Sequence, residues 1–370
     1  MTDRAVRSIE DLDTPVALVD VARLEANLAS MAAVAREAGV SHRPHAKTHK
    51  TRQIAERQLA HGAIGLTVAK VGEAEAMVDA GFEDLFVAYP LVGDIKLARL
   101  VALLDRARLR FEVDTIAGAQ AASAFLARRG RRVEVVVSLD GGAGRSGAAS
   151  PGDAIMLAER VAEMPGLELV GVMNYGNAYG TSDPVEQAAI GRREGEDAVG
   201  LAEAFRARGL RVDVVTVGST PTARHAVRVP GVTELRSGVY AFQDLKQVSL
   251  GPARLEDCAL TVMTTVVSHA RPDRYVLDAG IKALAGEDYG WGTWGRPPSR
   301  PDLAITRATE EHGVIELQPG AADPGWKIGE HVRIVPNHAC GTTNMHDELV
   351  AIDGDRIVER WPVIGRGRFR

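Results

Sequence analysis

Lys47 is the side chain in this sequence with the clearest capacity for covalent chemistry. It lies in the stretch Ser-His-Arg-Pro-His-Ala-Lys-Thr-His-Lys at residues 41–50. Pro44 disfavours a helix before it, so we expect a strand over residues 42–46, with His45 and Lys47 on the same side. A lysine buried there is costly as an ammonium, and a desolvated lysine is the amine that forms a Schiff base with a carbonyl. A solvated basic loop is the alternative interpretation.

Gly218-Ser219-Thr220 predicts a place for a phosphate group. A glycine turn, two hydroxyls and the amides before a helix can form an anion cup, and the tripeptide follows the eighth predicted strand, where barrels commonly hold phosphate. A Schiff-base lysine and a phosphate cup on one face suggest pyridoxal 5′-phosphate (PLP), an electron sink for a carbanion at the substrate α-carbon. A Schiff-base sugar-phosphate aldolase, which needs no metal, is the alternative.

His338 and Cys340 are candidate metal ligands. They stand two residues apart at the end of a predicted strand, so we expect both side chains to project to one side. A histidine and a thiolate give zinc two ligands and leave positions for water or substrate. A buried cysteine beside a capping histidine is the simpler interpretation. The other cysteine, Cys258, is expected in the core.

Two further polar clusters follow predicted strands. Arg145 lies in the glycine-rich loop 139–147, where glycines allow backbone to approach a ligand. Asn174, Tyr175, Asn177 and Tyr179 follow the strand predicted at 168–172. Because the reacting groups of a (β/α)8 barrel lie at the C-terminal ends of its strands, we expect these side chains on the same face as Lys47.

Alternating strands and helices predict the scaffold for these groups. Short β-branched runs predict strands at 16–19, 42–46, 64–68, 84–88, 109–113, 133–138, 168–172 and 212–217. Amphipathic helices are predicted between them, at 21–38, 70–80, 94–104, 116–128 and 186–208. Eight such alternations indicate an α/β fold, a TIM-like (β/α)8 barrel. A doubly wound sheet is the alternative, although no Gly-x-Gly-x-x-Gly follows the first strand.

The pattern changes after about residue 245. Strands are predicted at 261–268, 274–277, 313–317, 331–335, 349–352 and 356–360, separated by Pro, Gly and Asp turns. We therefore expect a PLP-binding barrel at 14–245, and a second, all-β domain at 1–13 and 246–370 that carries the metal site. Trp291 and Trp294 lie in a Gly- and Pro-rich stretch at 286–299, which predicts an ordered loop with local aromatic packing.

Composition and charge exclude several classes of partner. The net charge of −5 argues against a nucleic-acid binder, and the basic residues at 105–110 and 128–132 fall at predicted helix ends that face solvent. No apolar run of 18 residues suggests a membrane span, and residues 1–8 lack the apolar core of a signal peptide. We expect a cytoplasmic protein with no membrane partner.

Several motifs together resemble the D-serine dehydratase and D-threonine aldolase family. They are Asp13-Thr14-Pro15, Arg43 to Lys50, Gly218 to Pro221, Thr233 to Tyr240, Asp278 to Lys282, Glu311-His312-Gly313 and Pro336 to Cys340. The resemblance covers residues 12 to 365 and implies an alanine-racemase-type fold (PLP fold type III), in which the barrel is joined to a β-domain, usually in a homodimer.

The resemblance also implies roles for individual residues. Lys47 would hold PLP through its amine, and Arg145 would lie beside the phenolic oxygen of the cofactor. Ser219, Thr220, Gly238 and Tyr240 would surround the phosphate, and we add Gly218, His45 and Tyr175 to the cofactor site. We expect Lys47, Arg145 and Tyr175 to be the catalytic residues. His338 and Cys340 would hold a divalent metal, zinc by the softness of the thiolate or else manganese or magnesium, that binds the substrate's β-hydroxyl.

Within this family, the sequence resembles the dehydratase branch more than the aldolase branch. His-x-Cys, Gly-Ser-Thr-Pro, Gly176 to Tyr179 and Asp244 to Gln247 favour dehydration, whereas the aldolase branch carries a histidine after the tyrosine at Tyr175, where this chain has Gly176. We expect a PLP-dependent lyase that converts D-serine or D-threonine to a keto acid and ammonia. A D-threonine aldolase is the alternative, followed by a metal-free racemase-like enzyme and a non-catalytic PLP carrier.

Overall fold

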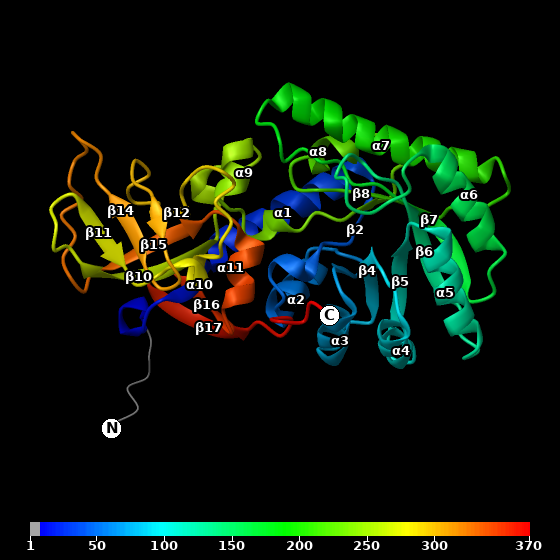
Figure 1. Ribbon diagram of the computed structural model, residues 1–370, viewed down its shortest axis with the longest axis horizontal. Helices are drawn as coiled ribbons and strands as arrows, with labels where there is room; N and C mark the ends of the chain where they lie inside the picture. Colours follow the sequence, from blue (N-terminus) through cyan, green and yellow to red (C-terminus); the bar gives the residue numbers. More distant parts are fainter. Residues whose placement is uncertain (1–7) are drawn as a thin grey trace. The chain divides into compact units, whose positions relative to one another are not determined.

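The computed structural model describes residues 8–370, which form two compact units (Figure 1). The barrel unit contains residues 29–47, 54–238 and 367–370. The β unit contains the chain up to residue 28, residues 48–53 and residues 239–366. Residues 1–7, which the sequence assigns to the β-domain, lie outside the described residues.

Eight parallel strands form the sheet of the barrel unit. In sheet order they are β2 (Ser41–His42), β9 (Glu234–Leu235), β8 (Val214–Val217), β7 (Leu167–Met173), β6 (Val133–Ser138), β5 (Arg108–Val113), β4 (Asp84–Pro90) and β3 (Leu66–Val68). A parallel bridge between His45 and Thr67 joins the two ends of this order, and the Thr67 amide donates to the Pro44 carbonyl at 2.8 Å. The sheet therefore curls into an alanine-racemase-like barrel, and the alternative of an open, doubly wound sheet is wrong.

Helices surround the barrel strands in Figure 1. They are α2 (Arg52–Ala60), α3 (Val71–Asp79), α4 (Asp94–Leu103), α5 (Ile116–Ala127), α6 (Pro151–Ala162), α7 (Pro184–Arg206) and α8 (Ala223–Ala226), while α1 (Val21–Ala38) precedes β2. Helix α6 shows why they form. The Ser150 hydroxyl caps its first turn, Pro151 begins it, and Ala154, Leu157 and Val161 form a buried stripe at helical spacing.

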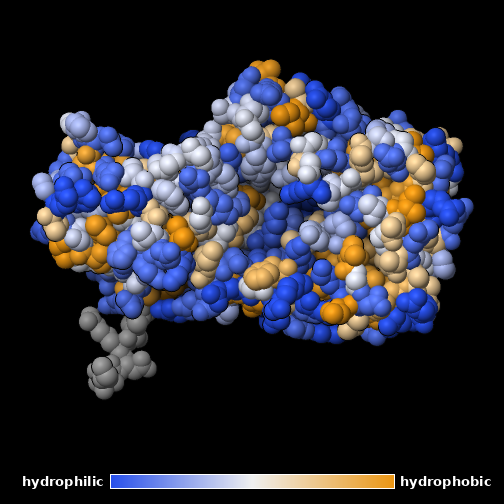
Figure 2. Space-filling model, viewed as in Figure 1, coloured by the Kyte–Doolittle hydropathy of each residue, from blue (hydrophilic) through white to orange (hydrophobic). Residues whose placement is uncertain are grey.

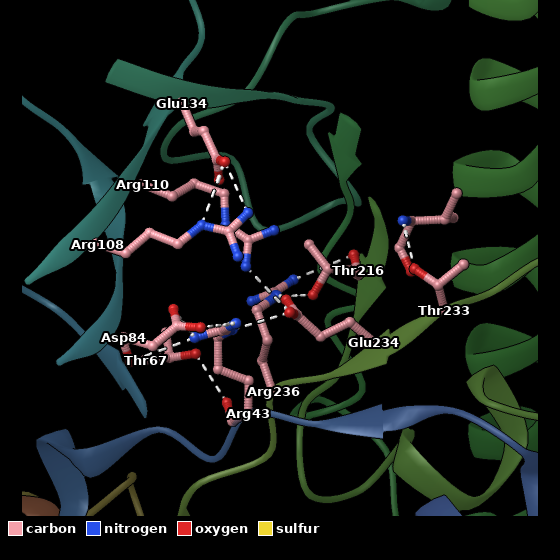
Figure 3. Close-up of polar contacts among 11 residues, drawn as sticks. Arg43, Thr67, Asp84, Arg108, Arg110, Glu134, Thr216, Thr233, Glu234 and Arg236 are labelled. Carbon is pink, nitrogen blue, oxygen red and sulfur yellow. Dashed lines mark hydrogen bonds and ion pairs between the residues drawn. The ribbon is translucent and has the colours of Figure 1, made fainter. Parts of the chain in front are cut away.

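The interior of the barrel contains a cluster of ion pairs, which we call the interior ion cluster: Arg43, Asp84, Arg110 and Glu234 (Figure 3). Glu234 accepts from Arg43 Nε at 2.8 Å and from Arg110 Nη2 at 3.1 Å, while Arg43 Nη1 lies 2.7 Å from Asp84. The sequence placed residues 105–110 in solvent. That expectation is wrong for Arg110, whose strand position points it into the barrel, where it is 5% exposed.

The β unit has a mixed sheet with a buried core. Its path runs β13 (Arg307–Ala308), β14 (Gly313–Glu316), β11 (Arg274–Leu277), β10 (Leu260–Ser268), β1 (Val16–Asp20), β16 (Glu348–Asp353) and β17 (Arg356–Pro362), with β15 (His331–Pro336) paired to β10 and to β12 (Gly295–Arg296). Its helices are short: η1 (Ile9–Asp11), η3 (Val239–Ala241), α9 (Leu245–Leu250), η4 (Leu255–Asp257), α10 (Ile281–Leu284) and α11 (Ala339–Met345). Tyr275, Ile315 and Ile334 are among the buried core residues. The predicted all-β character is therefore confirmed at the level of the sheet.

The strand predicted at 16–19 forms, but its predicted place in the barrel is wrong. As β1 it pairs antiparallel with β10 and parallel with β16, both in the β unit. The eighth barrel strand is instead β9, which is only two residues long. As a result β8 is the seventh barrel strand in chain order, so the loops after the seventh and eighth strands begin at Gly218 and Arg236.

Two observations concern the hydropathy of the helices and of the surface. No helix among residues 8–370 combines the length and the hydropathy that crossing a membrane requires. On the face drawn in Figure 2, hydrophobic side chains are scattered among hydrophilic ones.

Candidate functional site

Lys47 does not lie on a strand. Strand β2 ends at His42, and Lys47 sits in a single 3-10 turn, η2 (Ala46–Thr48), so the argument from strand alternation is wrong. The turn is anchored by His45, whose amide donates to the Ser237 carbonyl at 3.0 Å and whose Nδ1 faces the Lys47 amide at 3.4 Å. Lys47 is half-buried at the C-terminal side of β2, with its backbone tied to the loop that follows β9.

The predicted phosphate cup lies directly after β8. Gly218 has φ +130°, and a Cβ there would lie 2.8 Å from Leu235 Cδ1 and 3.0 Å from the Arg236 amide, so only glycine fits. The Ser219 hydroxyl lies 2.9 Å from the Thr222 hydroxyl, and Ser219 and Thr220 are both buried.

The neighbouring loop after β9 contributes to the same place. A Cβ on Gly218 would lie 3.3 Å from the Ser237 amide, which brings the two loops together. Within residues 8–370 the buried Ser237 hydroxyl has no hydrogen-bond partner. Gly238 follows it, buried at the edge of the barrel unit. A polar ligand between these loops would satisfy that hydroxyl.

Glu194 accepts a hydrogen bond from the loop that begins at Gly218, and the sequence did not predict this role. It lies on α7, is buried, and its Oε1 accepts from the Gly218 amide at 2.7 Å. Burial raises the pKa of this carboxyl. In the sequence, Glu194 looks like an ordinary residue of an amphipathic helix. No local pattern indicates that the Gly218 amide, more than twenty residues later, needs a hydrogen-bond acceptor.

Arg145 and Tyr175 are brought together by two adjoining loops. The guanidinium of Arg145 lies over the Tyr175 ring, 4.5 Å from its centroid. A Cβ on Gly141 would strike the Tyr175 carbonyl, which is the close approach that the glycines of this loop permit. Burial raises the pKa of Tyr175, while Arg145 opposes that rise. Tyr175 therefore stays a neutral donor at physiological pH.

Arg236 is a second buried residue to which the sequence analysis gave no role. Its Nε donates to Thr216 Oγ1 at 2.8 Å, and its Nη2 donates to the Asn174 carbonyl at 2.7 Å. Burial lowers the pKa of its guanidinium, and Glu194 is the first of the carboxylates that oppose this fall. Arg236 thereby fastens the loop that contains Tyr175 to the strand that leads into the cup.

These residues of the barrel unit fit PLP. They combine an amine at Lys47, a glycine that admits backbone to the ligand, hydroxyls at Ser219 and Thr220, and the unsatisfied hydroxyl of Ser237. Tyr240, which the resemblance added to the phosphate site, is a buried residue of η3 in the β unit.

In the β unit, His338 and Cys340 lie at the start of a helix and not on a strand. Strand β15 ends at Pro336, His338 is the N-cap of α11, and Cys340 is in its first turn. The two side chains still interact, and the Cys340 sulfur lies 3.3 Å from the Thr48 hydroxyl. Cys258 is buried beside Leu245 and Val335, so its expected place in the core is confirmed.

Asp244 orients the His–Cys pair. Its Oδ2 accepts from the Ala339 amide at 3.0 Å and lies 3.2 Å from His338 Nδ1. Burial alone would lower the pKa of His338, but the Cys340 thiolate and Asp244 raise it to about 11. With Nδ1 held by a carboxylate, Nε2 is the nitrogen that can face a metal, and metal binding there must release the proton that the raised pKa keeps on the ring.

A divalent metal fits this pair as two of its ligands. Among residues 8–370 no group of three or more His, Cys, Asp or Glu side chains is arranged to hold a metal. An imidazole nitrogen, a thiolate and open positions for water or substrate match a catalytic zinc site better than a structural one.

Three more side chains of the β unit lie near His338. Tyr289 meets the His338 ring edge-on, with centroids 6.1 Å apart, and contacts Trp291 at 5.3 Å. Lys246 Nζ lies 4.8 Å from the Tyr289 centroid and 5.2 Å from that of Trp291. Trp294 instead packs on the core, as local packing predicts. Lys246 and Tyr289 were not predicted as site residues.

Family models match most of the chain in two parts. A model described as alanine racemase, N-terminal domain, matches residues 19–245, and a model described as putative serine dehydratase domain matches residues 259–352.

Two relatives and one solved structure resemble the chain over nearly its whole length. D-threo-3-hydroxyaspartate dehydratase of Delftia sp. (strain HT23) is 36% identical, over 95% of this chain and 97% of that protein. D-threonine aldolase of Arthrobacter sp. is 35% identical, over 97% and 94%. A solved structure of a cysteine-to-alanine variant of D-threo-3-hydroxyaspartate dehydratase, described as metal-free, superposes with a TM-score of 0.89 at 34% identity, over 96% of this chain and 98% of that one.

Proposed function

The chain belongs to the D-serine dehydratase and D-threonine aldolase family of alanine-racemase-type, fold-type III lyases, and from this premise we propose that it is a PLP- and divalent-metal-dependent dehydratase of D-β-hydroxy-α-amino acids. Its products are a keto acid and ammonia. The observation that carries the proposal is the His–Cys pair, whose imidazole is oriented by Asp244.

PLP, when bound, supplies an electron sink for the carbanion that forms at the substrate α-carbon. The residues of the barrel unit do the rest. Lys47 would hold the cofactor through its amine, and the same amine would be the base for the α-proton of the substrate. Ser219, Thr220 and the Gly218 turn hold the phosphate, and Glu194 keeps the Gly218 amide in place. Arg145, which packs on Tyr175, would face the phenolic oxygen of the cofactor.

A divalent cation, when bound, supplies a Lewis acid for the β-hydroxyl and makes hydroxide a better leaving group. His338 and Cys340 hold the cation, and Asp244 fixes the tautomer and direction of the imidazole. Zinc is the proposed metal because a thiolate is a soft ligand.

Dehydration is favoured over retro-aldol cleavage by the space around Gly176. An aldolase needs a base that takes the proton of the β-hydroxyl, and the aldolase-like motif has a histidine after the tyrosine. A Cβ on Gly176 would lie 2.7 Å from Glu194 Oε2 and 3.1 Å from Glu194 Cβ, so a larger residue there would have to displace Glu194, which accepts from the Gly218 amide. A D-threonine aldolase remains the second candidate, supported by the 35% identity to the Arthrobacter enzyme.

The setting of the enzyme is part of the same proposal. We place it in the cytoplasm as a homodimer that acts on small D-amino acids, with no nucleic-acid or membrane partner. The net charge of −5 supports the absence of a polyanionic partner. Light scattering of the purified protein, which should give twice the chain mass, tests the dimer.

Product analysis tests the reaction. Holoenzyme incubated with D-serine, D-threonine or D-threo-3-hydroxyaspartate should release ammonia and a keto acid, whereas glycine and an aldehyde would identify an aldolase. Chelation should stop turnover and leave the absorbance of bound PLP unchanged. Cys340→Asp should shift the metal that restores activity from zinc to manganese or magnesium, because a hard ligand replaces a soft one. Full turnover by protein without detectable metal would contradict the metal-dependent mechanism.

A further inference from the structure

The loop that carries Arg145 is closed at its base by backbone hydrogen bonds. It runs from Leu139 to Ala148, and these two residues form a parallel bridge. The Ala148 amide donates to the Ser138 carbonyl at 2.8 Å, and the Asp140 amide donates to the Ala148 carbonyl at 3.1 Å. The two ends of the loop are therefore joined directly after strand β6.

The first half of the same loop is folded around one carboxylate. Asp140 Oδ1 accepts from the amides of Gly142, Ala143 and Gly144 at 3.0 to 3.1 Å. Arg145 comes next and is exposed, with its guanidinium over the Tyr175 ring. These bonds end one residue before Arg145, so its position also depends on what holds the residue that follows it.

Glu112 holds that residue, Ser146, from the neighbouring strand. Glu112 lies on β5, beside β6 in the sheet, and is 1% exposed. Its Oε1 accepts from the Ser138 hydroxyl at 2.7 Å, and the Ser146 hydroxyl hydrogen-bonds to the same carboxyl. One buried carboxyl therefore joins the last residue of β6 to the residue that follows Arg145.

The surroundings of Glu112 differ from those of Glu234 in the interior ion cluster. Glu234 accepts from two guanidiniums, whereas Glu112 accepts from two serine hydroxyls. Burial raises the pKa of Glu112, and Asp114 adds to this rise, while the two serines and then Arg236 oppose it. A buried carboxyl is costly unless it is hydrogen-bonded, so loss of either serine hydroxyl leaves part of that cost unbalanced. This cost favours the conformation in which the loop lies against the barrel.

We propose that Glu112 is a positioning residue for Arg145, because through Ser146 it fixes the backbone from which the guanidinium reaches the cofactor. The inference rests on the proposed function, in which Arg145 faces the phenolic oxygen of PLP. A guanidinium on a loose, glycine-rich loop would lose conformational freedom when PLP binds, whereas a fastened loop has that freedom restricted beforehand. Glu112 acts on the cofactor only through Arg145.

Two serine variants test the proposal and control for each other. Ser146→Ala and Ser138→Ala each remove one hydroxyl from the same carboxyl, so they should lower the melting temperature by similar amounts. Only Ser146→Ala should weaken PLP binding, by about threefold to tenfold, the value of one hydrogen bond. It should also shift the absorbance maximum of bound PLP in the direction in which Arg145→Met shifts it. Ser138→Ala should change the PLP dissociation constant by less than about twofold.

Variants of Glu112 and a double variant show whether the effect passes through Arg145. Glu112→Gln keeps the shape and one oxygen acceptor, so it should bind PLP nearly as well as the native chain. Glu112→Leu has no acceptor and should bind PLP at least as weakly as Ser146→Ala. Adding Ser146→Ala to Arg145→Met should cause no further loss of PLP affinity, whereas independent effects would multiply.

Hydrogen exchange separates this proposal from the proposed function, because it needs neither cofactor nor substrate. In protein without PLP, Ser146→Ala should speed exchange of the Gly144 and Ala148 amides by about threefold to tenfold, and Ser138→Ala should do so by less than about twofold. If this pattern holds but Arg145→Met leaves PLP binding unchanged, the cofactor role of Arg145 fails and its positioning by Glu112 stands. Equal effects of the two serine variants on PLP and on exchange, or multiplied losses in the double variant, would overturn the role of Glu112.

Discussion

Arg43 and Lys47 are four residues apart, yet they belong to two regions of the barrel unit that use charge differently. Arg43 is 3% exposed and belongs to the interior ion cluster, where every guanidinium meets a carboxylate of the protein (Figure 3). Lys47 lies half-buried in a turn at the C-terminal side of the strands, and Arg145 on the same side is exposed. The first region balances its charges internally, and we propose that the second binds a ligand.

The difference shows that residue type alone does not tell whether a basic side chain stabilises the fold or takes part in the reaction. A buried ion pair is costly to desolvate, but once formed it is very costly to break, so the interior ion cluster fixes the positions of the strands. We propose that Lys47 and Arg145 bind the cofactor, so we expect substitutions there to change activity more than stability. Variants in the two regions should therefore give opposite patterns in stability and activity.

Lys47→Ala should have the largest effect on activity. We expect turnover to fall to background, because neither the covalent link to PLP nor the base at the α-carbon remains. Thermal unfolding should shift by only a few degrees, because a half-buried lysine contributes little packing. Borohydride reduction followed by peptide mapping should label the peptide with Lys47 in the native protein. A labelled peptide without Lys47 would refute the cofactor assignment.

Glu234→Gln should have the largest effect on stability. It leaves Arg110 buried without a counter-charge and leaves Arg43 with Asp84 alone, a change that costs about 3–5 kcal/mol. The matched control is Glu134→Gln, since the ion pair of Glu134 with Arg108 is exposed and worth about 0–1 kcal/mol. Denaturant unfolding of both variants measures the difference. Equal losses would mean that the interior ion cluster is no more important than a surface pair.

The same cluster predicts how acid destabilises the barrel. Although burial alone would raise the pKa of Glu234, Arg110 and Arg43 lower it to about 2, below its ordinary value of 4.5. Stability from this group is therefore complete above pH 4.5 and is lost as the pH falls towards 2, by about 1.4 kcal/mol per pH unit. Melting temperatures between pH 6 and 3 should fall less steeply for Glu234→Gln than for the native chain. Parallel curves would exclude Glu234 as the source.

Thr220→Val should have the smallest effect, confined to cofactor binding. It removes one hydroxyl donor to a phosphate dianion, worth about 1.5–3 kcal/mol, so PLP affinity should fall by about tenfold or more. The fold should be unchanged because valine has nearly the same shape. Titration of apo-protein with PLP checks the affinity. An unchanged dissociation constant for PLP would mean that the phosphate does not bind at the loop after β8.

The sequence predicts those features that local pattern encodes. The strands β4 to β8 and helix α1 follow from hydrophobic periodicity, and Gly218 follows from a turn that only glycine can form. Lys47 was identified from its residue type and its place after a strand, although the strand is shorter than predicted.

The remaining features depend on contacts that are remote in sequence. A run such as Val16–Asp20 fits a buried strand in either sheet, and its partner Met263 decides which one. Glu194 looks like part of a solvated helical face until the Gly218 amide is placed against it. The helix at Ala339 is capped by Asp244, and nothing within ten residues of His338 predicts that contact.

The position of β1 sets an order on the folding of the nascent chain. β1 is synthesised before the other strands within residues 8–370, but it lies between β10 and β16, and its parallel partner ends at Asp353. The sheet of the β unit therefore waits for nearly the whole chain, whereas the barrel strands are complete by Leu235. Until β10 emerges, β1 is an unpaired apolar strand, and we expect it to be exposed to chaperones. Ribosome-stalled chains ending near residue 300 should protect the barrel from protease but leave residues 16–20 open to cleavage; protection of residues 16–20 would contradict this order.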